Sequence, residues 1–260
     1  MPTFGHYETI KQLHRTGFSA VFLGRNPADP ASTVAIKVYK PTVRVHDASG
    51  SSVRKNDFLN SAALQQKAAD ADATSWARIY DYGTSPEGEF YVTESFPCSA
   101  GHLIDGMAKT RPADLYAIMS NVLHGLLTLQ QTGKRAHANL KPSNVLISKP
   151  GRIADARIVL CDPLDENLPD QDTPVQTDLR NMGEMIHQLV THQPTASMKG
   201  WQAPESDHWK RLGKRAQDWR ALCNLLLRVD IEPHVTTLPQ LRDTLETLKP
   251  KQSFIQHLFG

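Results

Sequence analysis

The sequence of 260 residues has few cysteines, no long apolar run and almost no excess of charge. Its three cysteines, Cys98, Cys161 and Cys223, lie far apart without paired spacing, which argues against a disulfide framework and against a zinc site. No apolar stretch approaches the length that crosses a bilayer, and the first ten residues lack the basic and apolar regions of a secretion signal. A formal net charge of +2 gives no reason to expect a nucleic-acid partner. We therefore expect a cytoplasmic globular protein with no membrane segment in this chain.

The first third of the chain predicts a small antiparallel sheet. Apolar and polar residues alternate over residues 10–23 around a turn that contains Gly17, and residues 33–39 form a β-branched run; both patterns are typical of strands. Two more strand-like segments, 78–82 and 89–95, are joined by the turn sequence SPEG. We expect about five strands in this sheet.

One helix is expected beside the sheet. Residues 41–53 are polar and contain four serine or glycine residues in succession, a composition that predicts a loop. Asn56 or Asp57 is the expected N-cap of a helix that follows over residues 58–69, where apolar side chains form a roughly helical stripe.

From residue 112 onward the pattern becomes helical. Residues 113–131 carry a wide apolar face, which predicts a buried helix that ends near Gly133. Two short strand-like segments and a loop rich in aspartate and proline follow it. The remaining predicted elements are strands at 144–147 and 157–160 and helices at 178–190, 218–228 and 237–248, the last with Thr237 as its N-cap.

Together these patterns predict one domain of the α+β class with two lobes. Residues 1–96 are expected to form an N-terminal lobe, a small antiparallel sheet with one helix. Residues 97–260 are expected to form a mainly helical C-terminal lobe. The sequence shows no internal repeat that would suggest another architecture.

Three short motifs occur in order along the chain. VAIK ends at Lys37, HANLKPSN begins at His137 about a hundred residues later, and VLCDPL contains Asp162. This order resembles the eukaryotic-like Ser/Thr protein kinases, whose phosphate-binding lysine, catalytic loop and metal-binding aspartate lie in such motifs. By the same resemblance His137 has a structural role, and Asp178 looks like the residue that anchors the catalytic loop through its backbone. The resemblance covers nearly the whole chain and implies a two-lobed kinase-like fold.

Several residues that the family needs for phosphoryl transfer are replaced. The catalytic base, an aspartate in the family, aligns with Asn139, whose neutral amide cannot accept the proton of a substrate hydroxyl. The glutamate that pairs with the lysine aligns with Ser61, and the chain contains no glutamate between Glu8 and Glu87. The resemblance is therefore to a degenerate member of the family, a pseudokinase.

The loop that covers the phosphates in the family is also altered. Its three glycine positions read His14, Thr16 and Ser19, and only Gly17 remains between them. Side chains at these positions are expected to hinder the close approach of backbone to phosphate that glycine allows.

The activation segment is unusually short. Fifteen residues separate Asp162 from Asp178, positions 163–177, too few for an ordinary activation loop and a peptide-docking segment. Pro163 and Leu164 replace the Phe-Gly pair that follows the aspartate in the family, and proline fixes φ at this point. We expect this segment not to dock a peptide substrate.

Other positions of the family's nucleotide site are retained. The resemblance implies that Lys37 and Lys141 contact phosphate, and that Asn144 and Asp162 hold Mg²⁺. It also implies a hinge through Glu94, Ser95 and Phe96 behind the guarding Thr93, and an adenine slot lined by Val21, Ala35 and Leu146. The same residues also suit an ordinary core and turns, so weak binding of ATP with Mg²⁺ and no nucleotide binding both stay open.

Two functions compete on this evidence. The first is a protein-binding scaffold or allosteric regulator in signalling, whose protein partner the sequence does not identify. The second is an active transferase with atypical phosphoryl-transfer chemistry, in which Asp162 or an acid within residues 165–172 replaces the base. A purely structural role is a third alternative. The C-terminal segment 253–260 has an apolar helical side, which is expected to pack on the domain; contact with a neighbouring domain is the alternative.

Overall fold

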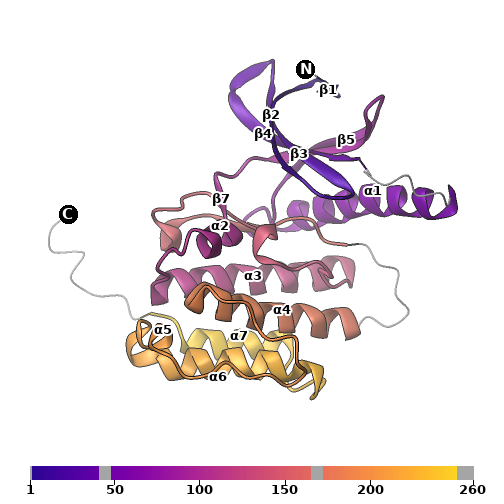
Figure 1. The fold of residues 1–260 in the computed structure, drawn as a ribbon. Helices are drawn as coiled ribbons and strands as arrows, with labels where there is room; N and C mark the ends of the chain where they lie inside the picture. Colours follow the sequence, from indigo (N-terminus) through magenta and orange to yellow (C-terminus); the bar gives the residue numbers. More distant parts are fainter. Residues whose placement is uncertain (1, 41–47, 165–171, 251–260) are drawn as a thin grey trace, which may run out of the picture.

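An antiparallel sheet of six strands forms one lobe of the structure, a computed structural model that describes residues 2–40, 48–164 and 172–250 (Figure 1). The sequence predicted about five strands and missed the first, whose two residues are too few to show a pattern. That strand pairs with the next one at Phe4 and Tyr7. In spatial order the strands are β1 (Thr3–Phe4), β2 (Tyr7–Arg15), β3 (Ser19–Asn26), β4 (Asp29–Tyr39), β6 (Gly88–Glu94) and β5 (Ile79–Ser85).

Strand β4 gives this sheet two different faces, because side chains alternate along a strand. One face is a closed apolar core, in which Val34, Ile36 and Val38 are at most 2% exposed. Ala35 and Lys37 point to the other face, where both are half-buried. This second face lies toward the helical lobe, since Lys37 forms an ion pair with Asp162 of that lobe. The closed core also contains Phe4, Tyr7, Phe90 and Val92.

Helix α1 (Ala48–Ala71) lies beneath the sheet (Figure 1) and begins earlier than predicted. The prediction of a loop up to residue 53 and of an N-cap at Asn56 or Asp57 was wrong for residues 48–57, which are helical. Serine and glycine are weak helix formers, so the local composition favoured a loop. Extending an existing helix costs far less than starting one, and the following turns are fixed by burial of Ala62, Gln65 and Ala68.

The second lobe is built on helix α3, which the sequence predicted closely (Figure 1). Its apolar side is fully buried, from Leu115 to Leu129. The helix ends after Gly133, and Lys134 takes the left-handed conformation with φ 51°. The helices are α2 (Ala100–Asp105), α3 (Pro112–Gly133), α4 (Asp172–Thr191), α5 (Asp207–Lys210), α6 (Ala216–Leu227) and α7 (Leu238–Thr247).

A small three-stranded sheet lies between α3 and the first lobe. Its strands are β7 (Cys98–Ser99), β8 (Val145–Ile147) and β9 (Ile158–Leu160), in that order. The strands β8 and β9 were predicted within one residue. The predicted N-cap of the last helix is confirmed, since the hydroxyl of Thr237 accepts from the backbone N–H of Gln240 at 3.4 Å. Within the described ranges, no helix has the length and apolar character needed to cross a membrane.

The crossing of α4 and α6 depends on a glycine. A Cβ atom at Gly183 would lie 2.9 Å from Cβ of Leu226 and 3.2 Å from the carbonyl oxygen of Cys223. We expect Gly183→Ala to lower the free energy of unfolding by about 1–3 kcal/mol, because the two helices must move apart. Urea denaturation measures this. Gly151→Ala is the control, since a Cβ there meets nothing within 4 Å, and an equal effect of both variants would contradict the close packing.

Candidate functional site

The residues that the sequence assigned to a catalytic loop and a metal site are neighbours in the structure. The side-chain N–H of Asn139 donates to the carbonyl oxygen of Asp162 at 3.0 Å. The side-chain N–H of Asn144 donates in turn to the carbonyl oxygen of Asn139 at 2.9 Å. The backbone N–H of Cys161 donates to the carbonyl oxygen of Asn144 at 3.1 Å. The loop after α3 and the residues after β9 therefore form one hydrogen-bonded unit.

Asp178 anchors this loop, as the sequence predicted. Its carboxylate accepts from the backbone N–H of His137 at 2.7 Å and from that of Ala138 at 3.1 Å. Ala138 has a positive φ of 57°, a conformation that costs energy for a residue with a Cβ. The two hydrogen bonds from α4 hold this turn in place and so fix the position of Asn139.

His137 is buried beneath the loop in one protonation state. Its Nε2 lies 3.0 Å from the carbonyl oxygen of Cys161, which can only accept, and its Nδ1 accepts from the backbone N–H of Asn139 at 3.3 Å. The imidazole is therefore neutral with its proton on Nε2, and it stacks on Trp76. Burial lowers the pKa of His137 to about 4. This confirms a structural role.

Lys37 pairs with Asp162 across the two lobes. Its Nζ lies 2.7 Å from Oδ2 of the aspartate, and the side chains of the pair are 21% and 19% exposed. The hydroxyl of Tyr91 donates to the other carboxylate oxygen. Burial opposes the charged carboxylate, but Lys37 and Tyr91 outweigh it and lower the pKa of Asp162. Both carboxylate oxygens therefore accept hydrogen bonds from the protein itself.

The backbone of Asp162 is held as firmly as its side chain. Its N–H donates to Oε1 of Gln65 at 2.8 Å, and Nε2 of Gln65 donates to the carbonyl oxygen of Ala77 at 2.9 Å. Gln65 is fully buried on α1. Asp162 has a positive φ of 59°, which these contacts stabilise. Ser61 lies one turn before Gln65 and is also buried.

These contacts decide how well the site suits a metal ion. Oxygen atoms of Asp162 and Asn144 are the donor type that Mg²⁺ prefers. However, Lys37 and Tyr91 already occupy both oxygens of Asp162, and Tyr91 is only 4% exposed. A divalent cation would have to compete with the ammonium group of Lys37. In this arrangement the residues do not form a ready site for Mg²⁺.

The turn between β2 and β3, which corresponds to the phosphate-covering loop, is closed on itself. The hydroxyl of Thr16 accepts from the backbone N–H of Phe18 at 3.2 Å and from that of Ser19 at 3.0 Å. Two backbone donors that a glycine-rich loop would direct at phosphate are thus bonded to a side chain of the turn.

The apolar residues predicted to line an adenine slot are partly buried in both lobes, and the slot itself stays a prediction. Val21 lies opposite Lys37 on the neighbouring strand and is half-buried, like Ala35. Leu146 of the helical lobe and Phe96 of the hinge pack against a buried cluster. The members of that cluster are Ala77, Val159 and Cys161.

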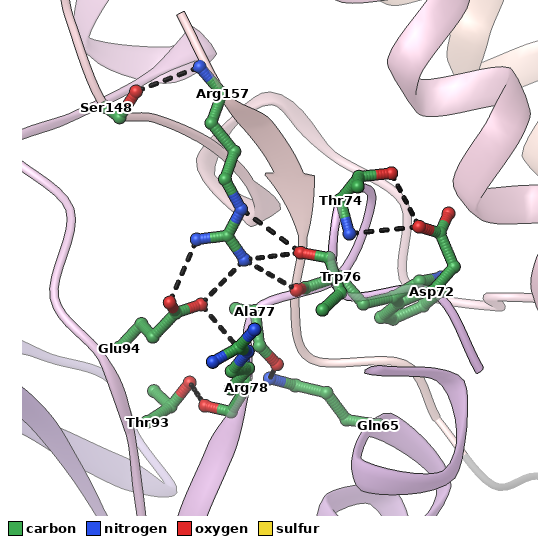
Figure 2. Close-up of polar contacts among 11 residues, drawn as sticks. Gln65, Asp72, Thr74, Trp76, Ala77, Arg78, Thr93, Glu94, Ser148 and Arg157 are labelled. Atoms are coloured by element: carbon green, nitrogen blue, oxygen red, sulfur yellow. Dashed lines mark hydrogen bonds and ion pairs between the residues drawn. The ribbon is translucent and has the colours of Figure 1, made fainter. Parts of the chain in front are cut away.

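The polar hinge residues have other partners. The hydroxyl of Thr93 donates to the carbonyl oxygen of Arg78 at 2.7 Å. The carboxylate of Glu94 forms two hydrogen bonds with Arg157 (Figure 2). Lys141 is exposed and interacts electrostatically with Asp162.

Sequence reasoning missed three residues of this region: Gln65, Tyr91 and Arg157. Strand alternation offered a signal for Tyr91, since it shares a face of β6 with Thr93 and lies opposite Lys37. Helical spacing offered one for Gln65, four residues after Ser61. No local pattern distinguished Arg157, because its partners are far away in the sequence.

Comparison with known proteins supports the fold. No protein-family model and no curated protein matches the sequence. Solved structures do match: the PknI kinase domain of Mycobacterium tuberculosis shares 18% identity over 95% of this chain and 98% of that one, with a TM-score of 0.65. A double mutant of that domain matches with 16% identity over 96% and 98%, with a TM-score of 0.66. At this identity the likeness shows the fold alone, a two-lobed protein-kinase-like fold.

The neutral state of His137 predicts a pH-dependent stability. A pKa that falls from 6.5 in the unfolded chain to about 4 in the fold gives stability that is present above pH 6.5 and lost as the pH falls toward 4. Between pH 7 and pH 5 we expect the wild type to lose about 2 kcal/mol more than His137→Gln, measured by urea denaturation.

The control is His14→Gln, which removes an exposed histidine and should leave the pH dependence of the wild type unchanged. If His137→Gln and the wild type lost the same stability over this range, the neutral buried imidazole would be refuted.

Proposed function

We propose that this chain is a kinase-like domain that does not transfer phosphate and that acts in the cytoplasm as a protein-binding scaffold or allosteric regulator in signalling. The observation that carries the proposal is the state of Asn139. Its amide occupies the position of the catalytic base and donates to the carbonyl oxygen of Asp162. An amide cannot accept the proton of an attacking hydroxyl, and loss of such a base alone costs about 10²- to 10⁴-fold in rate.

The ion pair between Lys37 and Asp162 supports the same conclusion. In the kinase family the lysine at this position binds phosphate, and the aspartate binds the metal ion. Here they neutralise each other at 2.7 Å, and Tyr91 adds a hydrogen bond to the carboxylate. The two charges thus stabilise the closed arrangement of the lobes instead of presenting themselves to a substrate.

The closed turn at Thr16 and the short stretch between Asp162 and Asp178 weaken the case for substrate binding further. The turn directs the N–H groups of Phe18 and Ser19 at its own hydroxyl. The acidic residues within 165–171 that an atypical transferase would need lie outside the described residues. Binding of a protein partner to the two-lobed surface would explain why the chain retains the kinase-like fold although residues needed for phosphoryl transfer are replaced.

The first test is a phosphoryl-transfer assay. We expect purified protein with radiolabelled ATP and Mg²⁺ to give no labelled product above background, on itself or on a generic protein substrate. Asn139→Asp should not restore transfer, because Lys37 and Asp162 remain paired. Transfer that disappears in Lys37→Ala would establish the atypical transferase and end the scaffold proposal.

Weak nucleotide binding is the second candidate function. Val21 and Ala35 are half-buried on the sheet, and Leu146 is partly buried in the helical lobe; the resemblance makes these three residues the lining of an adenine slot. Lys37 and the exposed Lys141 are the cations for phosphate. We expect ATP to bind weakly, and Mg²⁺ to contribute little while Lys37 occupies Asp162.

Tyr91→Phe tests this assignment. Removing the hydroxyl frees one oxygen of Asp162, so the increase in melting temperature caused by Mg²⁺ on top of ATP should be larger in the variant than in the wild type. The control is Tyr82→Phe, which alters a tyrosine 43% exposed on β5. Equal responses to ATP in the wild type, Lys37→Ala and Asp162→Ala would rule out this site.

A further inference from the structure

The segment between α1 and β5 belongs to the first lobe by sequence but is embedded in the second. Trp76 is fully buried in the core of the helical lobe, and its indole N–H donates to the carbonyl oxygen of Gly125 on α3 at 3.1 Å. The backbone N–H of Ala77 donates to Leu160 at 3.0 Å, and the N–H of Leu160 donates to Ser75 at 2.8 Å. This segment therefore moves with β9 and α3.

Arg157 is the residue before β9, and its side chain binds the same segment through hydrogen bonds (Figure 2). Its guanidinium donates to the carbonyl oxygen of Ala73 at 2.7 and 3.1 Å and to that of Trp76 at 3.1 Å. Its backbone N–H donates to the hydroxyl of Ser148, the residue after β8, at 2.9 Å. The backbone of the arginine is thus bound to the helical lobe, and its guanidinium is bound to the segment embedded in that lobe.

The guanidinium group of Arg157 also reaches the end of β6, where the chain passes from one lobe to the other. Nη1 and Nη2 form a bidentate pair with the carboxylate of Glu94 at 2.9 and 2.8 Å, and Nη2 is shared with the contacts to Ala73 and Trp76. The same carboxylate accepts from the backbone N–H of Arg78 at 3.0 Å, and the N–H of Glu94 donates to the carbonyl oxygen of Arg78 at 3.1 Å. The guanidinium also lies 5.5 Å from the ring centre of Phe96.

The geometry makes this pair different from an ordinary surface ion pair. A bidentate pair of arginine and carboxylate is directional, and the planar guanidinium group loses little conformational entropy when the pair forms. The side chains of Arg157 and Glu94 are 33% and 17% exposed. By contrast, the nearby pair of Arg152 and Asp155 is 78% and 60% exposed and has a single short contact of 2.9 Å, so it contributes little.

From these contacts we infer that Arg157 is a clamp that fixes the angle between the two lobes. It joins the hinge at Glu94 and Phe96 to the embedded segment at Ala73 and Trp76, so opening of the lobes about the hinge must break the bidentate pair. The chain then presents both lobes to a partner as one rigid surface. This inference concerns lobe motion and holds whether or not the domain transfers phosphate.

The distance between the lobes tests the clamp directly. The three native cysteines are buried, so spin labels can be attached selectively through Ala28→Cys on the first lobe and Lys214→Cys on the second, both at exposed positions. Pulsed electron paramagnetic resonance then gives the distribution of distances. We expect one narrow distribution that ATP and Mg²⁺ do not change.

Breaking the clamp should broaden that distribution. Arg157→Met removes all its side-chain hydrogen bonds, and Glu94→Gln keeps the shape of the acceptor but removes its charge. Both should broaden the distances and raise the hydrogen-exchange rate of the Arg78 amide by about tenfold or more. Arg152→Met is the matched control and should change neither quantity.

Two results would overturn the inference. One is a broad distribution in the wild type. The other is a distribution as narrow as the wild type in a folded Arg157→Met variant, with folding established by circular dichroism. If Arg157→Met does not fold, Glu94→Gln decides in the same way, because it leaves the arginine and its contacts with Ala73 and Trp76 in place.

Discussion

The structure of this domain depends on one residue, Asp162, all of whose polar groups are bound by the protein. Its carboxylate accepts from Lys37 and Tyr91, its N–H donates to Gln65, and its carbonyl oxygen accepts from Asn139. These partners come from β4, β6, α1 and the loop after α3. A position that resembles a metal ligand in the sequence is therefore the point where the two lobes and the loop are joined, and its contacts explain why the carboxylate stays charged despite burial.

The same contacts, with those of Arg157, join parts of the domain that lie far apart in the sequence. Gln65 binds Asp162 and Ala77 at once, which ties α1 to the residues after β9. Arg157 ties the hinge to the segment that contains Trp76. Enzymes of this fold class use lobe and loop movements to admit substrate and assemble the site. Under the proposed function, the two joined points would let the domain present a fixed surface to a partner.

Much of this arrangement could be predicted from the sequence, but its ties between distant segments could not. The strong apolar period of α3 and the anchor at Asp178 follow from local patterns and from the order of the motifs. The start of α1 could not be predicted, because residues 48–56 are rich in serine and glycine, which are weak helix formers. They are helical because they extend the helix that the buried turns later in the chain already form. The spacing of Gln65 from Ser61 places it on the inner side of the helix but does not reveal its partner, and Arg157 carries no local signal at all, because its partners lie 63 to 84 positions away.

Equilibrium unfolding of Asp162→Ala in urea tests the central role of Asp162 most directly. A residue kept for metal binding can be removed without loss of stability, whereas removal of this one leaves Lys37 unpaired and partly buried. The account predicts that the free energy of unfolding falls by about 3 kcal/mol, while Asp155→Ala, which breaks an exposed pair, changes it by less than about 1 kcal/mol. An unchanged or increased stability of Asp162→Ala would contradict the account.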